Sequence, residues 1–270
     1  MVVQHNLSAM NTNRQMGVVT SALQKSTEKL SSGYKINRAG DDAAGLSISE
    51  KMRSQIRGLN KASDNAQDGI SLIQVAEGAL NETHSILQRM NELATQAVND
   101  TNTSVDRQSI KDEIEQLNEE LDRISTTTQF NKQDLLTGGF SGKLQVGALE
   151  GQTMDVKISL AVSAKGLKVS AVEVSTNAKA GAAMQSIQDA IESVSKQRSK
   201  LGAIQNRLEH TINNLDTNAE NTQAAESRIR DTDMADEMVQ YSKNNILSQA
   251  GQSMLAQANQ QTQGVLSLLG

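Results

Sequence analysis

The sequence predicts a mainly α fold: a long antiparallel helical bundle or coiled coil that carries a small antiparallel β-hairpin region. Three observations predict it. Apolar residues recur at alternating spacings of four and three over long stretches, proline is absent from all 270 residues, and one short central region alternates with a period of two. Apolar residues at four-three spacing form a single stripe on a helix, which is buried by packing against another helix. Long helices lying side by side are therefore expected.

The longest helix is expected from about Ala43 to Val98, roughly 80 Å long at about 1.5 Å per residue. Asp41 or Asp42 can cap its start and favour the helix dipole. A helix of this length cannot be enclosed by a compact globule. Its seam comprises apolar Met52, Ile56, Leu59, Ala66, Ile70, Ile73, Leu80, Leu87, Ala94 and Val98, interrupted by Ser63, Glu77, His84 and Asn91.

Two further helices complete the predicted bundle. One opens after the capping-box pattern from Thr103 to Asp106, and the other occupies much of the C-terminal half. Their apolar residues have the same spacing, so three long helices can share one core. The seam of the first is Ile110, Ile114, Leu117, Leu121 and Ile124; that of the second is Ile187, Ile191, Val194, Leu201, Leu208, Ile212, Leu215 and Ala219, interrupted by Arg198 and Gln205.

A small antiparallel β region is expected between these helices, from about Gly138 to Ser175. Apolar and polar residues alternate there with a period of two, and the intervening GALEGQ supplies turn glycines. The alternating apolar residues are Leu144, Val146, Met154, Val156, Ile158 and Leu160. No other β region is predicted.

Both ends of the chain carry apolar residues at helical spacing but hardly any charge. Residues 244–270 contain no charged side chain, and the first thirteen residues contain none apart from His5. Each end is therefore expected to form an amphipathic helix, and the two helices can pair with one another. Uncharged Gln, Asn and Ser on the remaining faces suit a helix surrounded by neighbouring chains. The apolar positions are Val3, Leu7, Met10, Val19, Leu23 and Leu30 near the start, and Leu247, Gly251, Met254, Ala258, Val265 and Leu268 near the end.

The sequence gives little sign of catalysis, metal binding or a cofactor. His5, His84 and His210 are far apart, and His84 falls on the helix seam, where a hydrogen-bonded core histidine is expected. The acidic cluster at 231–237 lacks the glycine and the terminal Glu of a calcium loop. A net charge of −5 provides no basic stripe for nucleic acid. The N-terminus has no apolar run typical of a cleaved signal, and no stretch is apolar enough to insert in a membrane.

Three long motifs resemble bacterial flagellin. They are INRAGDDAAGLSISEKMRSQIRGLNKASDNAQDGISLIQVAEGALNE at 36–82, LQVGALEGQTMDVKISL at 144–160, which resembles the inner β-hairpin of that family, and NILSQAGQSMLAQANQQTQGVLSLLG at 245–270. The resemblance implies a D0 coiled coil formed by the termini and a D1 rod formed by the central helices and β region. It divides the chain into an N-terminal D0 helix and connecting segment (1–40), D1 N-terminal helices and β region (41–177), a D1 C-terminal helix (178–228) and a C-terminal D0 helix (229–270).

The resemblance also implies a function. A flagellin is a structural subunit that is exported unfolded, without a cleaved signal peptide, and self-assembles outside the cell into the flagellar filament for motility. Implied partners are further copies of the chain, the flagellar export apparatus and chaperone, and the cap and junction proteins. The outer domains of the family, which would be inserted around 163–179, are replaced by a short connection. The residues expected to drive polymerisation are Val3, Leu7, Met10, Leu247, Met254, Val265, Leu268 and Leu269.

Two alternative functions remain open at this point. A hook–filament junction protein shares the D0 and D1 plan of the same superfamily and differs in its end sequences and copy number. From the periodicity alone, an intracellular coiled-coil scaffold is also possible. An enzyme is not expected, since no constellation of catalytic residues is recognised.

A receptor site is implied by one further motif. LQRMNELA at 87–94 resembles the segment of flagellins that Toll-like receptor 5 recognises, although Asn91 stands where many relatives have a second basic residue. The resemblance implies that the monomer is a ligand of this innate immune receptor. The candidate contacts are Leu87, Gln88, Arg89 and Leu93, together with Glu113 on the next helix.

Overall fold

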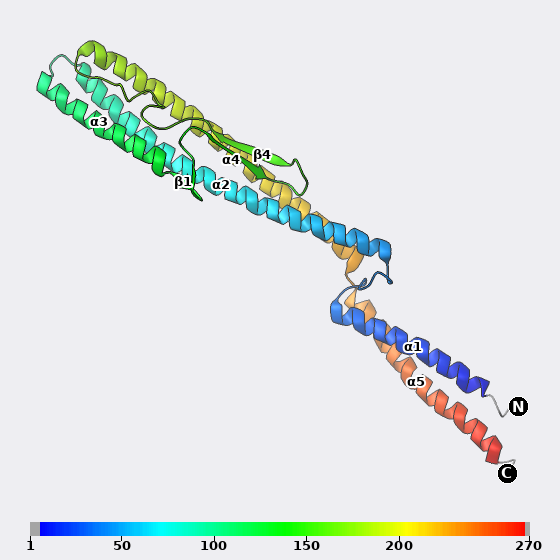
Figure 1. Ribbon diagram of the computed structural model, residues 1–270. Coiled ribbons are helices and arrows are strands. Elements are labelled where there is room, and N and C mark those ends of the chain that lie inside the picture. Colours follow the sequence, from blue (N-terminus) through cyan, green and yellow to red (C-terminus); the bar gives the residue numbers. More distant parts are fainter. Residues whose placement is uncertain (1–5, 268–270) are drawn as a thin grey trace. The chain divides into compact units, whose positions relative to one another are not determined.

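The computed structural model describes the backbone of residues 6–267 and the side chains of residues 6–261. The described part consists of long helices and two short antiparallel strand pairs (Figure 1), which confirms the mainly α fold. The helices are α1 (Leu7–Ser32), α2 (Ala43–Val98), α3 (Ser104–Thr127), α4 (Asn177–Arg230) and α5 (Met234–Ser267). The strands are β1 (Gln129–Phe130), β2 (Gln133–Asp134), β3 (Phe140–Gln145) and β4 (Thr153–Ile158).

The chain forms two compact units. The terminal unit comprises Met1–Ser54 and Asn221–Gly270, and the central unit comprises Gln55–Glu220. These units divide within α2 and α4, whereas the boundaries expected from the sequence, after residues 40, 177 and 228, lie at or near helix ends. The D0 and D1 assignment of those ranges stays a prediction.

The core of the central unit is aliphatic and follows the predicted seams. It contains buried residues from α2, α3, α4 and the β region in one continuous cluster. The predicted seam positions Ala66, Ile70, Ile73, Leu80, Leu87, Ala94, Ile110, Ile114, Leu121, Ile124, Ile187, Val194, Leu201 and Leu208 all belong to it. Two of the polar interruptions also meet, because Arg198 Nη2 of α4 lies 3.8 Å from Glu77 Oε1 of α2. The seams therefore hold α2 and α4 together by both apolar contact and a charge pair.

The predicted start signals of α2 and α3 are present. Asp42 Oδ1 accepts a hydrogen bond from the backbone N–H of Gly45 at 2.9 Å. At α3, Thr103 and Asp106 form a reciprocal capping box. The hydrogen bonds from Thr103 to the Asp106 carboxylate lower the pKa of Asp106, since they favour its charged form. Both helices thus begin where side-chain oxygens satisfy otherwise unpaired backbone donors.

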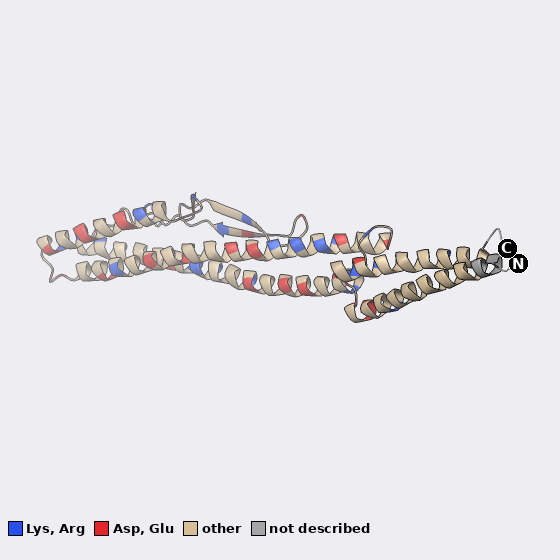
Figure 2. Ribbon diagram, turned by 90° about the horizontal axis from the view of Figure 1, so that it is seen from below, with Lys and Arg blue, Asp and Glu red and all other residues tan. Residues whose placement is uncertain are grey.

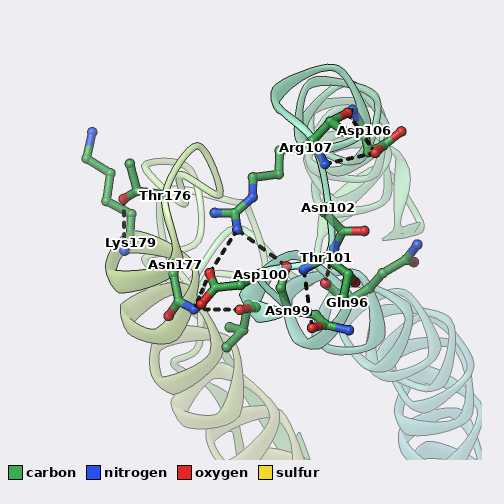
Figure 3. A network of polar contacts seen from close by, with 12 residues as sticks. Gln96, Asn99, Asp100, Thr101, Asn102, Asp106, Arg107, Thr176, Asn177 and Lys179 are labelled. Carbon is green, nitrogen blue, oxygen red and sulfur yellow. Dashed lines mark hydrogen bonds and ion pairs between the residues drawn. The ribbon is translucent and has the colours of Figure 1, made fainter.

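A polar network joins three helix ends at one end of the central unit (Figure 3). Asn177, the first residue of α4, donates from Nδ2 to the backbone oxygen of Val98 at 2.7 Å and to Asp100 Oδ1 at 3.0 Å. Arg107 of α3 donates to the backbone oxygen of Asn99 at 3.4 Å. The C-terminus of α2 is therefore capped by side chains from α3 and α4, which fixes the positions of the three ends.

The predicted hairpin is formed by β3 and β4. Phe140 pairs with Ile158 and Gln145 with Thr153, and the alternate residues Met154, Val156 and Ile158 of β4 are buried. The period of two was therefore interpreted correctly as far as Ile158. Beyond β4, residues 159–176 form no further named strand, so Leu160 lies outside the hairpin. Val162 and Val169 of this segment are nevertheless fully buried, and they pack on the helices through an irregular backbone.

The prediction of a single β region was wrong, because β1 and β2 form a second hairpin. Gln129 pairs with Asp134 and Phe130 with Gln133. Two residues per strand are too few to show an alternating pattern. The turn also lacks the usual sequence signal, because Asn131 and Lys132 both have positive φ, 48° and 62°, and neither is a glycine.

Within the terminal unit, the two segments that connect the helices are hydrogen-bonded to one another. The backbone N–H of Thr232 donates to the oxygen of Gly33 at 3.0 Å, and that of Lys35 donates to the oxygen of Arg230 at 2.6 Å. The segment leaving α1 is thus paired with the segment entering α5. We call this paired segment, residues 33–35 with 230–232, the joint.

Arg230 supplies most of the side-chain contacts of the joint. Its guanidinium lies 4.5 Å from the centre of the Tyr34 ring, a cation–π contact, and its Nη1 lies 3.3 Å from Glu50 Oε1. Glu226 lies within 4.0 Å of the same nitrogen and accepts a hydrogen bond from the fully buried hydroxyl of Ser49 at 2.7 Å. The joint therefore connects the ends of α1 and α4 with the first turns of α2.

Gly138, directly before β3, is a position that requires glycine. Its φ is +94°, and an added Cβ would lie 2.7 Å from the Cβ of Ala161 and 3.0 Å from its backbone nitrogen. Gly138→Ala should therefore lower the free energy of unfolding by about 1–3 kcal/mol, since both backbone strain and a clash with backbone oppose it. Urea denaturation followed by circular dichroism measures this loss.

The matched control is Gly139→Ala. Gly139 has no atom within 4 Å of a built Cβ and no positive φ, so its replacement should change the stability by less than about 0.5 kcal/mol. Equal effects of the two substitutions would contradict the argument.

Candidate assembly surface

The terminal helices α1 and α5 pack against one another along one face of each helix. The less exposed positions of each helix recur at the four-three spacing, which defines the contact face, here called the inner seam. On α1 these positions are Ala9, Thr12, Met16, Val19, Leu23, Ser26 and Leu30; on α5 they are Glu237, Tyr241, Asn244, Ser248, Gly251, Leu255 and Ala258. The inner seam therefore combines large apolar side chains, mainly on α1, with small or polar ones, mainly on α5.

Three contacts show how the two helices fit together along the inner seam. An added Cβ at Gly251 of α5 would lie 3.8 Å from Cγ and 3.9 Å from Cβ of Met16 on α1. Near the free end of the pair, Asn6 Nδ2 donates to the backbone oxygen of Ala258 at 2.9 Å, and near the other end Lys29 Nζ lies 3.4 Å from Glu237 Oε2. Gly251 thus leaves room for the side chain of Met16, and polar contacts join the two helices near both ends of the pair.

The larger apolar side chains of this pair face outward. Among the described side chains of α1 and α5, three on α1 and six on α5 are large, apolar and 44–69% exposed. They are Leu7, Met10, Val18, Met234, Met238, Val239, Ile246, Leu247 and Met254, and we call them the outer apolar set. At about 100° per residue, Leu7, Met10 and Val18 lie on the side of α1 opposite the inner seam. On α5 they occupy both flanks of the seam and the opposite side.

The expected pairing stripe of α5 was therefore partly wrong. Gly251 and Ala258 do face α1, but Leu247 and Met254 from the same predicted stripe are exposed. Leu7 and Met10 of α1, which were also expected to contact the other end, are exposed as well. Val3, Leu268 and Leu269 lie outside the described residues, and so does the side chain of Val265.

Charge is almost absent along this surface. Figure 2 shows α1 and α5 as mostly tan helices, in contrast to the red and blue segments of α2, α3 and α4. The charged residues of α5 are Asp236, Glu237 and Lys243, all in its first ten positions. An exposed surface that combines large apolar side chains with neutral polar ones is typical of a protein contact.

The predicted receptor residues divide between the surface and the core. Leu87 is 0% and Leu93 2% exposed, so neither side chain is available to a partner of the folded monomer. Arg89 is exposed and donates from Nε to Glu113 Oε1 of α3 at 2.9 Å; this bond, with a second one to Glu92, raises the pKa of Arg89. Gln88 is also exposed and lies 3.1 Å from His84 Nε2. The accessible part of the predicted receptor site is thus Gln88, Arg89 and Glu113.

Other kinds of site are not found in the part of the chain that the structure describes. No group of His, Asp and Glu side chains in residues 6–261 is arranged to hold a metal ion. No helix within the described ranges is long and apolar enough to cross a membrane.

Comparison with known families decides the identity. The profile of the bacterial flagellin N-terminal helical region matches residues 3–141, and that of the bacterial flagellin C-terminal helical region matches residues 184–269. The chain belongs to the bacterial flagellin family. Flagellins are structural subunits of the flagellar filament outside the cell, and the chain is accordingly a structural protein that self-assembles, not an enzyme.

Individual relatives agree over the full length. The chain is 56% identical over 271 residues to a flagellin of Halalkalibacterium halodurans, and the alignment covers 100% of both. It is 51% identical over 285 residues to the flagellar filament 31.3 kDa core protein of Treponema maltophilum, again with 100% of both covered. The crystal structure of Bacillus cereus flagellin is 33% identical with a TM-score of 0.52, and the match covers 60% of this chain and 94% of that one.

The inner seam of this flagellin can be tested with a disulfide, because the chain has no cysteine of its own. A built Cβ at Gly251 lies 3.9 Å from the Cβ of Met16, within the range of about 3.5–4.5 Å that a disulfide requires. The monomeric double variant Met16→Cys/Gly251→Cys should therefore form an intramolecular disulfide under mild oxidation. The faster-migrating monomer band on a non-reducing gel reports it.

The matched control is Val18→Cys/Gly251→Cys, in which the first cysteine lies on the opposite side of α1. This variant should stay unlinked as a monomer. Cross-linking of both variants at the same rate would show that α1 and α5 do not keep the register described.

Proposed function

We propose that the outer apolar set is the surface by which each subunit packs on its neighbours in the filament. The observation that carries this proposal is the arrangement of α5, whose larger apolar side chains lie mostly on its flanks and far side, while the residues that face α1 are mainly small or polar. A helix that is apolar on several sides is stable in water only where several neighbours cover it. Self-assembly supplies those neighbours as further copies of the chain.

The chemistry of the surface fits repeated burial. Fully burying a Leu or Met side chain contributes about 1.5–3 kcal/mol. The neutral Gln, Asn and Ser residues between the apolar positions can exchange hydrogen bonds with a neighbouring subunit, and they lack the desolvation cost of a charge. Each gain recurs at every subunit, so single substitutions should have measurable effects on polymerisation.

Leu247→Gln tests the proposal. Leu247 is 44% exposed in the monomer, so its replacement should leave the monomer folded. Loss of its burial in the filament should cost about 1 kcal/mol per subunit, which raises the critical concentration for polymerisation about fivefold. Sedimentation of filaments grown at a series of monomer concentrations measures that quantity.

Ser242→Gln is the control, because Ser242 is an exposed polar residue of the same helix. Its critical concentration should match that of the wild type. If Leu247→Gln also polymerises like the wild type while remaining helical, the outer apolar set is not the assembly surface.

The route of export and the partner proteins of the chain are inferred from its membership of the flagellin family. We infer export of the unfolded monomer without a cleaved signal peptide, with the export apparatus, a chaperone, and the cap and junction proteins as partners. The absence of proline and cysteine supports rapid refolding after export, since no X-Pro isomerisation or disulfide rearrangement can delay it. Abundant intact chain in the culture medium would distinguish a filament subunit from a junction protein of low copy number and from an intracellular scaffold.

We also propose that the monomer is a ligand of Toll-like receptor 5 through the exposed residues of α2 and α3. The observation that favours this is the exposed ion pair between Arg89 and Glu113, which places a planar donor group and a carboxylate side by side across two helices. Arginine in such a setting is common among interface hot spots. Leu87 and Leu93 support this surface from the core and do not contact a partner themselves.

Arg89→Ala should weaken receptor binding by about 1 kcal/mol or more, which is about a fivefold increase in Kd. Surface plasmon resonance with the immobilised receptor ectodomain measures it. Arg123→Ala is the control, because Arg123 is also exposed but pairs with Glu120 on its own helix. The receptor site is excluded if both variants bind as the wild type does while their helical content is preserved.

A further inference from the structure

Methionine is distributed unevenly over the molecule. Among the described side chains, the four exposed methionines all lie on α1 and α5; they are Met10, Met234, Met238 and Met254, with exposures of 47–64%. In the central unit, Met90 is 0% and Met154 7% exposed. The most exposed of the described thioethers therefore all belong to the outer apolar set, where they make up four of its nine members, whereas Met16, Met52 and Met184 are half-buried.

We propose that these four methionines are oxidation sites, and that their conversion to the sulfoxide prevents the monomer from joining the filament. The inference rests on the proposed assembly role of the outer apolar set. The oxidant is hydrogen peroxide: its O–O bond breaks, one oxygen forms a bond to the thioether sulfur, and the other leaves as water with both protons. The sulfur gives up an electron pair to the peroxide, so no further reductant or co-reactant is needed.

The chemistry of the product opposes assembly. A thioether is apolar and flexible, and it adapts to the irregular gaps of a contact surface. A sulfoxide is polar and carries a strong hydrogen-bond acceptor, which must lose its water when a neighbouring subunit covers it. Val239, Ile246 and Leu247 of α5 belong to the same exposed set and are apolar, so a sulfoxide on this helix interrupts an otherwise apolar contact surface.

The exposure of the four methionine side chains differs between the free monomer and the proposed filament contact. In the free monomer all four side chains are open to the solvent, whereas the core of a single chain covers Met90 and Met154 and partly covers Met184. Neighbouring subunits would cover the four sites once the monomer is incorporated. Oxidation therefore acts on monomers awaiting assembly and leaves the existing filament intact. Sulfoxide formation is also reversible by methionine sulfoxide reductases, so the effect can be undone.

The first test maps the sites. Purified monomer and preformed filament are treated with the same limited dose of hydrogen peroxide and analysed by peptide mass spectrometry. In the monomer, peptides with Met10, Met234, Met238 and Met254 should gain the mass of one oxygen atom per site, ahead of those with Met90 and Met154. In the filament the same four sites should be protected. Uniform oxidation of all methionines in the monomer would overturn the assignment.

The second test measures assembly. The treated monomer should show a critical concentration raised about tenfold or more, and treatment with methionine sulfoxide reductases should restore it. The variant with Met10→Leu, Met234→Leu, Met238→Leu and Met254→Leu keeps the apolar surface but has no thioether there. Its critical concentration should be the same with and without peroxide, whatever its value before treatment.

The outcomes separate this inference from the proposed assembly surface. If the oxidised wild type polymerises normally while Leu247→Gln is impaired, the surface stands and the oxidation inference falls. If the four-leucine variant is inhibited by peroxide as strongly as the wild type, the effect lies at other residues and the inference is again overturned. If neither oxidation nor Leu247→Gln changes the critical concentration, the proposed assembly surface fails as well.

Discussion

Two helices lying side by side can cover only one face of each, and this constraint governs the packing of α1 and α5 in the terminal unit. In the contact between α1 and α5, apolar residues such as Met16 on α1 face small residues such as Gly251 on α5. Further leucine, methionine and valine side chains lie on the outside, where the other helix of the pair does not bury them. In the proposed assembly, neighbouring subunits cover these side chains.

The central unit obeys the same constraint with a different result. Three helices and a hairpin pack around one another, so α2 can bury apolar residues on more than one side, for example Leu87 and Met90. Its surface is accordingly charged and exchanges ion pairs such as Arg89 with Glu113. Exposed pairs of this kind contribute little to stability individually, because water screens them. The stability of the central unit thus depends on its own core, whereas the proposed assembly surface of the terminal pair is left for neighbouring subunits to cover.

The long helices could be predicted from the sequence because several local signals agree. The bounds of α2 follow from the seam and from Asp42 as its cap, and the start of α3 follows from Thr103 and Asp106. The burial of Leu87 could also be predicted, since this residue lies on the seam of α2. The face of α5 was not predictable from apolar spacing. Small and polar residues make up most of the face of α5 that contacts α1, and a pattern of such residues carries no hydrophobic signal.

The joint ties together parts of the chain that are far apart in sequence. Its two backbone hydrogen bonds, from Thr232 to Gly33 and from Lys35 to Arg230, join the segment leaving α1 to the segment entering α5. Arg230 also contacts the Tyr34 ring and Glu50, so the same residue links these segments to α2. Contacts of such high sequence separation close a long loop, so the joint forms after the local turns of its helices when the chain folds.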